Sequence, residues 1–358
     1  MKKLLAATLS IILSMTTLIG CTEKNEANSS SSTKVEDVSN NDEELPILKV
    51  GVLPFLNSIP VKYMVDNGLD TANGFKIETV FFPTGGPMNE ALASNLWDVG
   101  TLSAASVYSL ATYGAYVVAD IGHAEGGIET LVNSDSPIAS VKGYNPTYPE
   151  ILGDPDTVRG ATIAVPTGTL SQLNVFKWLE KIELDPSEVS IVHMDFAQAY
   201  QALLAKQCDV AALNPPTSYT AEDKGMAVTS SLVSLDIPLY DSIIASKDAH
   251  ENKKELLVKY TKAFFEATNA LQANPAMAEQ LLMDWYKENG SDITPETCKM
   301  EISTRPFVTS EEAKGITVGD SVKITAEFYA SQGLIEVDKL NIVNDHVQDD
   351  VVKEALGY

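Results

Sequence analysis

Short apolar runs alternate with apolar residues at helical spacing along most of the chain. Residues 161–165 form a β-branched run, the loop 166–169 follows, and apolar residues then recur at helical spacing through 173–182. The same order returns within 190–213 as strand, helix and strand. Alternating strands and helices predict parallel sheets, and ligands of such sheets bind outside the carboxyl ends of the strands.

The first part of the chain carries further strand patterns, expected at 47–53, 75–82, 97–102, 115–121 and 126–133. The first four end in loops of polar or small residues. Because parallel strands place such loops at one edge of a sheet, we expect these loops to gather. Later helices are expected at 253–272, 275–288 and 318–332.

Two segments are interpreted as crossings between lobes, since residues 46–358 are too many for one ordinary core. One is the proline-rich stretch 135–156, and the other is 240–246. The predicted fold class is α/β with two lobes, each a mixed sheet flanked by helices, joined by two hinge strands. The lobes are expected to comprise residues 46–132 with 245–358, and residues 133–244. Two hinged lobes enclose a cleft that can close.

The N-terminus has the pattern of an export signal. Two lysines precede the apolar run 4–18, and Leu18-Ile19-Gly20-Cys21 follows. This resembles a bacterial lipoprotein signal, which implies removal of residues 1–20 and a lipid on the sulfur of Cys21. The polar residues up to 45 are too poor in apolar side chains to fold and are interpreted as a tether. We therefore expect an exported protein that is lipid-anchored at the outer face of the cytoplasmic membrane.

The formal net charge of −24 argues against a nucleic-acid partner. It also repels anionic headgroups, so the lipid is expected to be the sole membrane attachment. Cys208 and Cys298 fall in different predicted lobes and are expected to be free thiols rather than a disulfide.

Motifs for catalysis or metal binding are missing from the sequence. The histidines are scattered, and no HExxH, GxSxG or GxxxxGK[ST] pattern occurs. We therefore predict no catalytic residues, no metal site and no cofactor.

The loop after the strand 161–165 is the first candidate for a binding site. Thr169 or Ser171 can cap the following helix, and Gly168 lets backbone N–H groups turn outward. A small acceptor group of a ligand would suit these donors. The alternative is an ordinary strand-to-helix turn that binds nothing.

Two long stretches carry a family resemblance. They are GGPMNEALASNLWDVGTLSAASVYSLATYGAYVVADI and RGATIAVPTGTLSQLNVFKWLEKIELDPSEVSIVHMDF, the latter with its sequel CDVAALNPP. The chain resembles the type II substrate-binding proteins of ATP-driven (ABC) importers, the class of nitrate, sulfonate, taurine and thiamine-precursor binders. The resemblance implies a monomeric binding protein that is not an enzyme and that works with a permease and an ATPase.

The same resemblance implies a set of ligand-facing positions in the cleft loops: Leu53, Asn57, Thr84, Gly85, Ser103, Ala104, Thr167, Gly168, Thr169, Ser171 and Asn214. Many relatives carry an aromatic residue where Asn214 stands, so a stacking contact is not expected there. With Arg159 and Arg305 as its two arginines, the chain has no cluster for a multiply charged anion.

Three further candidates follow from their predicted places near the cleft. Glu125 follows a strand, and Tyr240 with Asp241 lies at the second crossing. A carboxylate in the cleft could pair with an amine of the ligand, whereas the alternative is a solvated loop charge. The expected ligand is a small polar organic molecule with one acceptor-rich group: a sulfonate, a carboxylate or a nitrogen heterocycle with a ring carbonyl.

Two other functions stay open. The opening LKVGVLPFLNSIPVKYMV is similar to menaquinone-pathway chorismate dehydratases, enzymes of the same fold. The export signal argues against such a cytoplasmic enzyme. A sensory binding lipoprotein without a transporter cannot be distinguished from a transport protein by sequence.

Overall fold

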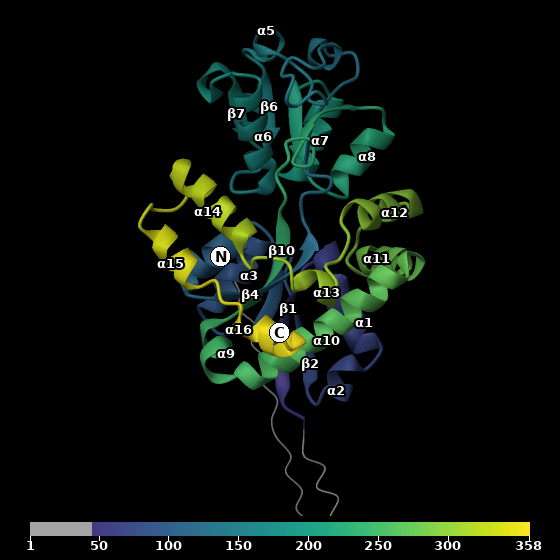
Figure 1. The fold of residues 1–358 in the computed structure, drawn as a ribbon. Coiled ribbons are helices and arrows are strands. Elements are labelled where there is room, and N and C mark those ends of the chain that lie inside the picture. Colours follow the sequence, from purple (N-terminus) through teal and green to yellow (C-terminus); the bar gives the residue numbers. More distant parts are fainter. Residues whose placement is uncertain (1–44) are drawn as a thin grey trace, which may run out of the picture. The chain divides into compact units, whose positions relative to one another are not determined.

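Two five-stranded sheets organise residues 45–358, the part of the chain that the computed structural model describes (Figure 1). The first sheet has the order β2-β1-β3-β10-β4, with β1 (Ile47–Val52), β2 (Lys76–Phe81), β3 (Val99–Leu102), β4 (Tyr116–His123) and β10 (Tyr240–Ala245). The second has the order β7-β6-β8-β5-β9, with β5 (Glu129–Val132), β6 (Thr162–Val165), β7 (Ser190–His193), β8 (Val210–Leu213) and β9 (Ala227–Ser231).

Each sheet combines parallel and antiparallel pairs. Strands β2, β1 and β3 are parallel, and β10 runs antiparallel between β3 and β4. The second sheet repeats the arrangement, because β7, β6 and β8 are parallel and β5 runs antiparallel between β8 and β9. The predicted two mixed α/β sheets are confirmed.

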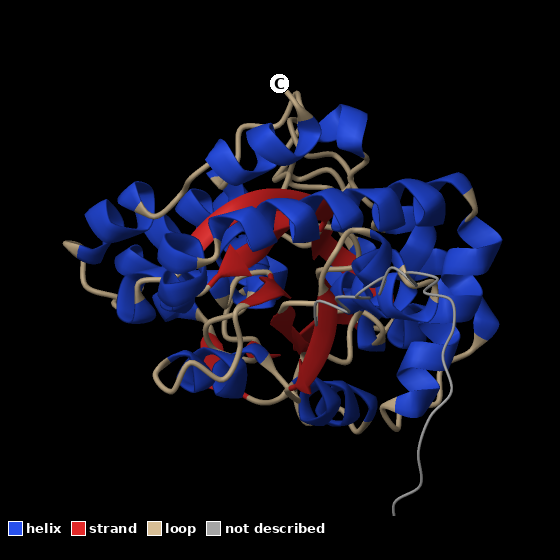
Figure 2. Cartoon of the chain, turned by 90° about the horizontal axis from the view of Figure 1, so that it is seen from below, coloured by secondary structure: helices blue, strands red, loops and turns tan. Residues whose placement is uncertain are grey.

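Helices surround the strands, as the view in Figure 2 shows. Those that precede β5 are the 3₁₀ turn η1 (Leu56–Ser58), α1 (Ile59–Asp66), α2 (Leu69–Ala72), α3 (Gly85–Leu92) and α4 (Ser106–Tyr113). Between β5 and β10 lie η2 (Pro137–Ser140), α5 (Pro155–Val158), α6 (Leu170–Lys181), η3 (Pro186–Glu188), α7 (Phe196–Leu204) and α8 (Thr217–Asp223). After β10 come α9 (Lys247–Asn252), α10 (Lys254–Ala273), α11 (Pro275–Glu288), α12 (Pro295–Thr304), α13 (Ser310–Ala313), α14 (Asp320–Ser331), α15 (Lys339–Asp345) and α16 (Asp350–Leu356).

Sheet membership bears on where the lobes divide. Strand β5 belongs to the second sheet and β10 to the first, so the chain changes sheets between β4 and β5 and returns between β9 and β10. The expected boundaries at 132/133 and 244/245 would put both strands on the other side. We propose the division at the connections 124–128 and 232–239, because ladder hydrogen bonds tie each strand to its sheet. The terms first lobe and second lobe are used below in this sense.

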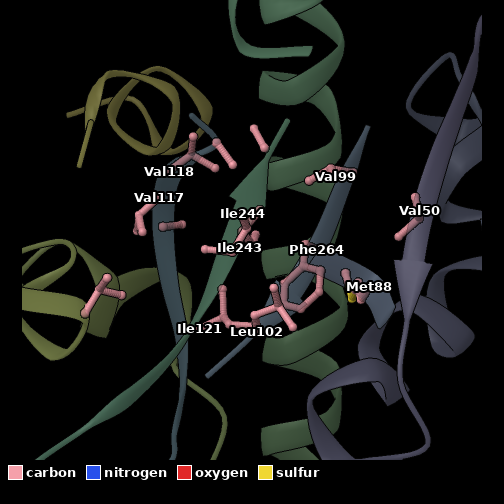
Figure 3. Close-up of a cluster of buried hydrophobic side chains, with 14 of the residues drawn as sticks. Val50, Met88, Val99, Leu102, Val117, Val118, Ile121, Ile243, Ile244 and Phe264 are labelled. Carbon is pink, nitrogen blue, oxygen red and sulfur yellow. The ribbon is translucent and has the colours of Figure 1, made fainter. Parts of the chain in front are cut away.

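The core of the first lobe lies between its sheet and the helices on it. Val50, Val99 and Ile243 come from neighbouring strands and belong to one buried cluster with Phe264 of α10 (Figure 3). All four side chains are fully buried. Strand β3 is buried along its whole length because both faces of this sheet are covered.

Met88 of α3 reaches the sheet because two strands carry glycine there. A Cβ on Gly51 or Gly100 would lie 2.6 or 2.3 Å from the Met88 methyl carbon. Trp97 donates its indole N–H to the Met88 carbonyl at 2.8 Å, which fixes the same helix against β3. This close approach sets the position of the loop before α3, one of the candidate ligand loops.

Several local predictions are confirmed. Helix α11 spans Pro275–Glu288 as expected, with the proline in its first turn. Thr169 caps α6, whereas Ser171 does not. Cys208 and Cys298 are buried free thiols.

Some elements of the fold lack a clear signal in the sequence. Strand β9 and the helices α12, α15 and α16 were not predicted. These are short segments rich in polar residues.

The export signal, Cys21 and the tether up to residue 44 lie outside the described residues, so lipidation stays a prediction. Within residues 45–358, no helix is both long and apolar enough to cross a membrane.

Candidate functional site

Two loops of the first lobe meet at Asp241, the second residue of β10. The side chains of Asn57, from the 3₁₀ turn after β1, and of Ser103, which follows β3, hydrogen-bond to the Asp241 carboxylate. Tyr240 lies beside it on the same strand. The carboxyl ends of the parallel strands β1 and β3 thus meet the start of the antiparallel strand β10.

Two small recesses adjoin these residues. The first, which we term the acceptor recess, is lined by Leu56, Asn57, Pro60, Ile121, Gly122, His123, Asp241, Arg305 and Phe307. Its volume of about 10 Å³ has room for about one water molecule. The second, the interlobe recess, is lined by Ser103, Ala104, Ser106, Leu170, Leu239, Tyr240, Ser321, Val322 and Thr325. It brings Leu170 of the second lobe against the Ser103 loop of the first.

A buried ion-pair cluster forms one side of the acceptor recess. The Arg305 guanidinium lies 3.0 Å from the Asp241 carboxylate and 3.3 Å from that of Glu301. Tyr286 donates its hydroxyl to Glu301 at 2.8 Å. Burial raises the pKa of Asp241, and the attraction of Arg305 and hydrogen bonding from Asn57 and Ser103 oppose that rise. Burial likewise raises the pKa of Glu301.

Glu125 is engaged within the protein rather than exposed to solvent. Its carboxylate accepts from the Leu239 N–H at 3.2 Å and lies 2.8 Å from the His123 ring. The bond to Glu125 raises the pKa of His123. Burial would raise the pKa of Glu125, but hydrogen bonds from His123 and Leu239 bring it below its usual value. Glu125 therefore joins the two connections between the lobes.

The loop 166–171 of the second lobe satisfies part of its own backbone. The Thr167 N–H donates to His193 Nδ1 at 3.1 Å, and the Gly168 N–H donates to Gln172 Oε1 at 2.8 Å. The N–H groups of Thr169, Leu170 and Ser171 have no partner among residues 45–358. These three groups and the dipole of α6 suit a small acceptor group.

Contacts across the lobes hold this loop against the first lobe. Tyr329 of α14 donates its hydroxyl to the Gly168 carbonyl. Tyr108 of α4 packs on Tyr329, with ring centroids 5.3 Å apart. Phe176 of α6 and Phe328 of α14 make a further aromatic pair at 5.6 Å. The loop thus faces α4 and α14 across the line between the lobes.

Three further positions that the sequence predicted for the site, Leu53, Thr84 and Gly85, belong to the first lobe. Leu53 is buried, and its N–H and carbonyl are bonded to Ser58 and to the Trp285 indole. Thr84 is exposed, and the next residue, Gly85, packs on the Ser103 loop, where an added Cβ would lie 2.5 Å from that of Ala105.

Two expected positions of the second lobe lie close together. Ser171 is buried and donates its hydroxyl to the Leu213 carbonyl at 3.0 Å. Asn214 follows Leu213, and its carbonyl accepts the Ser218 N–H. The Ser171 side chain thus has a partner within the protein, while its backbone N–H does not.

Sequence reasoning missed Arg305, Leu170 and Tyr329 as site residues. One signal was available for Arg305, because it is one of two arginines in an acidic chain. Among residues 45–358, no group of three or more metal-ligating side chains occurs.

Residues 41–283 match the family model described as the NMT1-like family. The chain belongs to this family. An ABC transporter periplasmic binding protein of Brachyspira hyodysenteriae is 62% identical over 310 residues, which cover 87% of this chain and 90% of that protein. The NMT1-like chain is thus similar to a transport binding protein along nearly its whole length.

Solved structures show that its fold is that of type II periplasmic binding proteins. The periplasmic aliphatic sulphonate binding protein SsuA of Escherichia coli matches with a TM-score of 0.67 at 18% identity, over 85% of this chain and 92% of that one. The periplasmic nitrate-binding protein NrtA of Synechocystis PCC 6803 matches with a TM-score of 0.66 at 13% identity, over 88% and 89%. At these identities the likeness concerns the fold.

The predicted family and fold class are therefore confirmed. The relatives are extracytoplasmic solute-binding components of ABC importers and not enzymes, and this chain belongs to the same class. The chorismate dehydratase alternative is excluded on that ground.

Proposed function

We propose that this NMT1-like protein is a lipid-anchored solute-binding protein that captures one small polar organic ligand between its lobes. It then delivers the ligand to an ABC permease with its ATPase. The observation that carries the proposal is the loop 166–171, where three free N–H groups of the second lobe lie beside the Ser103 loop of the first. The ligand's acceptor group binds there, with Thr84, Gly85 and Asn214 at the rim.

The acceptor group is a carboxylate, a monoanionic sulfonate or a ring carbonyl. Sulphonate and nitrate are named as ligands of the Escherichia coli and Synechocystis proteins, and those proteins share the fold. In this chain the arginine nearest the site already pairs with two carboxylates. A dianion such as a phosphate would find no further arginine, so one compact, singly charged group fits best.

Binding requires the lobes to separate and close again. A recess of about 10 Å³ is far below the roughly 300 Å³ of even a small organic-ligand pocket. The ligand enters an open form and stabilises a closed one, which the permease recognises. Ligand at about a thousand times its Kd then adds about 4 kcal/mol to the free energy of unfolding.

A thermal-shift screen of the full-length protein tests the ligand class. Sulfonates, amino acids, aromatic acids and pyrimidines form the test set, with divalent metals, oligopeptides and sugars as the contrasting set. We expect at least one compound of the test set to raise the melting temperature. Shifts confined to metals, oligopeptides or sugars contradict the proposal.

Leu170→Pro tests the backbone donors directly. Leu170 is the first residue of α6, where proline is tolerated, and Thr169 before it is extended, as a residue before proline should be. The change deletes one N–H donor, so we expect the affinity of the best hit to fall about tenfold. Leu170→Ala is the matched control, since it removes the side chain but keeps the N–H. Equal affinities of the two variants contradict the assignment.

The mass of the native protein tests whether Cys21 carries the proposed lipid anchor. Native protein extracted from membranes should begin at Cys21 and carry the mass of a diacylglyceryl group. Cys21→Ser should be released or left unprocessed. A native mass without the adduct, or a different first residue, contradicts the lipid anchor while leaving the ligand proposal intact.

A further inference from the structure

Two buried oxygen atoms in the acceptor recess lack hydrogen-bond donors. They are Oδ1 of Asn57 and Oδ1 of Asp241, and neither has a partner within the described residues. The two residues are 8% and 3% exposed, and both line the recess. Buried acceptors are nearly always satisfied in folded proteins, so two in one recess point to a donor that enters it.

Three of the protein's own donor groups nearby are already engaged. Arg305 uses all three of its nitrogen atoms, on Asp241 Oδ2, on Glu301 and on the His123 carbonyl. Thr101 donates its hydroxyl to the Asn57 backbone carbonyl, not to the side chain. The His123 ring faces Glu125 and Glu312. The Asn57 and Ser103 side chains also adjoin the Asp241 carboxylate, yet Oδ1 of Asp241 and Oδ1 of Asn57 have no hydrogen-bond partner among the described residues.

The charges around the recess favour a donor that is positive or neutral. Strand β10 contributes Asp241, and α12 contributes Arg305 and Glu301, which makes two carboxylates for one guanidinium. Strand β4 contributes His123, whose ring is offset by Glu125 and Glu312. The 3₁₀ turn after β1 contributes the neutral Asn57. An anion entering here would meet excess negative charge in a buried setting.

The size of the acceptor recess limits which chemical groups can enter it. Room for about one water molecule admits an ammonium group or a single N–H, but not a carboxylate or a sulfonate. The recess also adjoins the interlobe recess, because Ser103, which lines the interlobe recess, hydrogen-bonds to Asp241, which lines the acceptor recess. A group on a bound ligand can therefore occupy it.

We propose that the acceptor recess receives a nitrogen donor of the ligand, a primary ammonium or an N–H, between Asn57 Oδ1 and Asp241 Oδ1. This rests on the proposed function and deepens it, because it gives the ligand a second end. The acceptor group lies on the loop 166–171, and the nitrogen lies in the first lobe. Zwitterions such as amino acids or aminosulfonates, and amino-substituted heterocycles, have this pattern.

Matched pairs of compounds test the nitrogen end on the full-length protein by calorimetry. Taurine against ethanesulfonate and β-alanine against propionate differ by an ammonium group, and 4-aminopyrimidine against pyrimidine differs by an amino group. We expect the nitrogen-bearing member of at least one pair to bind about tenfold tighter or more, the effect of a hydrogen bond to a charged group. Equal or tighter binding by the member without the nitrogen overturns the proposal.

Asp241→Asn separates the two kinds of donor. The variant keeps an acceptor oxygen and removes the charge, so preference for an ammonium should fall to about threefold or less, and preference for a neutral amino group should persist. Asn57→Ala should weaken both. Asp98→Asn is the matched control, because Asp98 is a buried carboxylate paired with Lys253 in the same lobe but outside the recess. Preferences unchanged in both recess variants overturn the proposal.

Methylammonium chloride is a probe that does not depend on the acceptor end. A crystal soaked in it should show the nitrogen within hydrogen-bond distance of both Oδ1 atoms, and the same soak of Asp241→Asn should not. Water alone in the wild-type recess overturns the nitrogen site. If methylammonium occupies the recess but no compound of the thermal-shift test set binds, the nitrogen site stands. The placement of the ligand's acceptor group on the loop 166–171 is then wrong.

Discussion

The two sides of the proposed cleft present their polar groups in opposite ways. The first lobe presents side-chain oxygens, at Asn57 and Asp241, supported by a buried ion-pair cluster. The second lobe presents backbone N–H groups, at residues 169–171, held by the conformation of the loop before α6. One side offers acceptors and the other donors, so the cleft fixes the direction of an unsymmetrical ligand.

The difference also separates the kinds of substitution each side tolerates. Where side chains contact the ligand, as in the first lobe, one substitution changes the chemistry of the contact. Where backbone N–H groups contact the ligand, as in the second lobe, most substitutions leave the donors in place. A change in the loop conformation removes them. The following predictions test that contrast, beginning with the largest effect.

Arg305→Leu should cost the most stability. It leaves Asp241 and Glu301 buried without their cation, and breaking a buried pair costs about 3–5 kcal/mol. Lys206→Ala is the control, because Lys206 pairs with Asp135 at an exposed site, where ion pairs contribute about 0–1 kcal/mol. Urea unfolding of both variants measures the contrast. A loss below about 1 kcal/mol for Arg305→Leu would mean that the two carboxylates are not held as charges.

Gly168→Ala should disturb the loop that presents the backbone N–H groups of residues 169–171. Gly168 has φ +72°, and a side chain in that region costs about 1–2 kcal/mol. An added Cβ would lie 3.6 Å from the Tyr108 hydroxyl, an ordinary contact, so the cost is conformational. Gly86→Ala is the control, since its φ is not positive and nothing lies within 4 Å of an added Cβ. Equal melting temperatures of the two variants would contradict the conformational role of Gly168.

Tyr329→Phe should loosen the contact between the lobes. The hydroxyl donates to the Gly168 carbonyl, and losing such a bond costs about 1 kcal/mol. Tyr260→Phe is the control, because the Tyr260 hydroxyl is buried without a partner in the described chain, so its removal should be neutral or stabilising. Chemical unfolding ranks the two variants, and the reverse order would refute the interlobe bond.

The smallest effect concerns the pH dependence of His123 and Glu125 at the connections between the lobes. The raised pKa of His123 gives stability that is full below its unfolded value of about 6.5 and is lost as pH rises through the folded value. The lowered pKa of Glu125 gives stability present above about 4.5 and lost as pH falls through its folded value. The pair therefore contributes most between these two limits.

His123→Gln should remove the decline in stability on the alkaline side of that window and weaken the decline on the acidic side, because His123 is the main group that lowers the pKa of Glu125. Unfolding measured from about pH 4 to pH 9 checks this. An unchanged pH profile would show that the pair does not couple proton binding to folding.

Features that depend on neighbouring residues could be predicted from the sequence alone. The strand–loop–helix order, the start of α11 at Pro275, the Thr169 cap and the donor-rich loop before α6 all follow from local spacing and backbone chemistry. The absence of catalytic motifs and the free thiols were also readable from residue types and their separation.

Features that depend on contacts between distant residues became visible only in the folded structure. Asp241 and Arg305 are 64 residues apart, and their bond forms because β10 inserts between β3 and β4 while α12 packs on α11. No local pattern distinguishes a strand that pairs with one sheet from a strand that pairs with the other. The same holds for Tyr329, which contacts Gly168 across 161 residues. Loop closure over such separations is governed by the packing of the whole chain, and so Arg305 and Tyr329 emerged as site residues only in the folded structure.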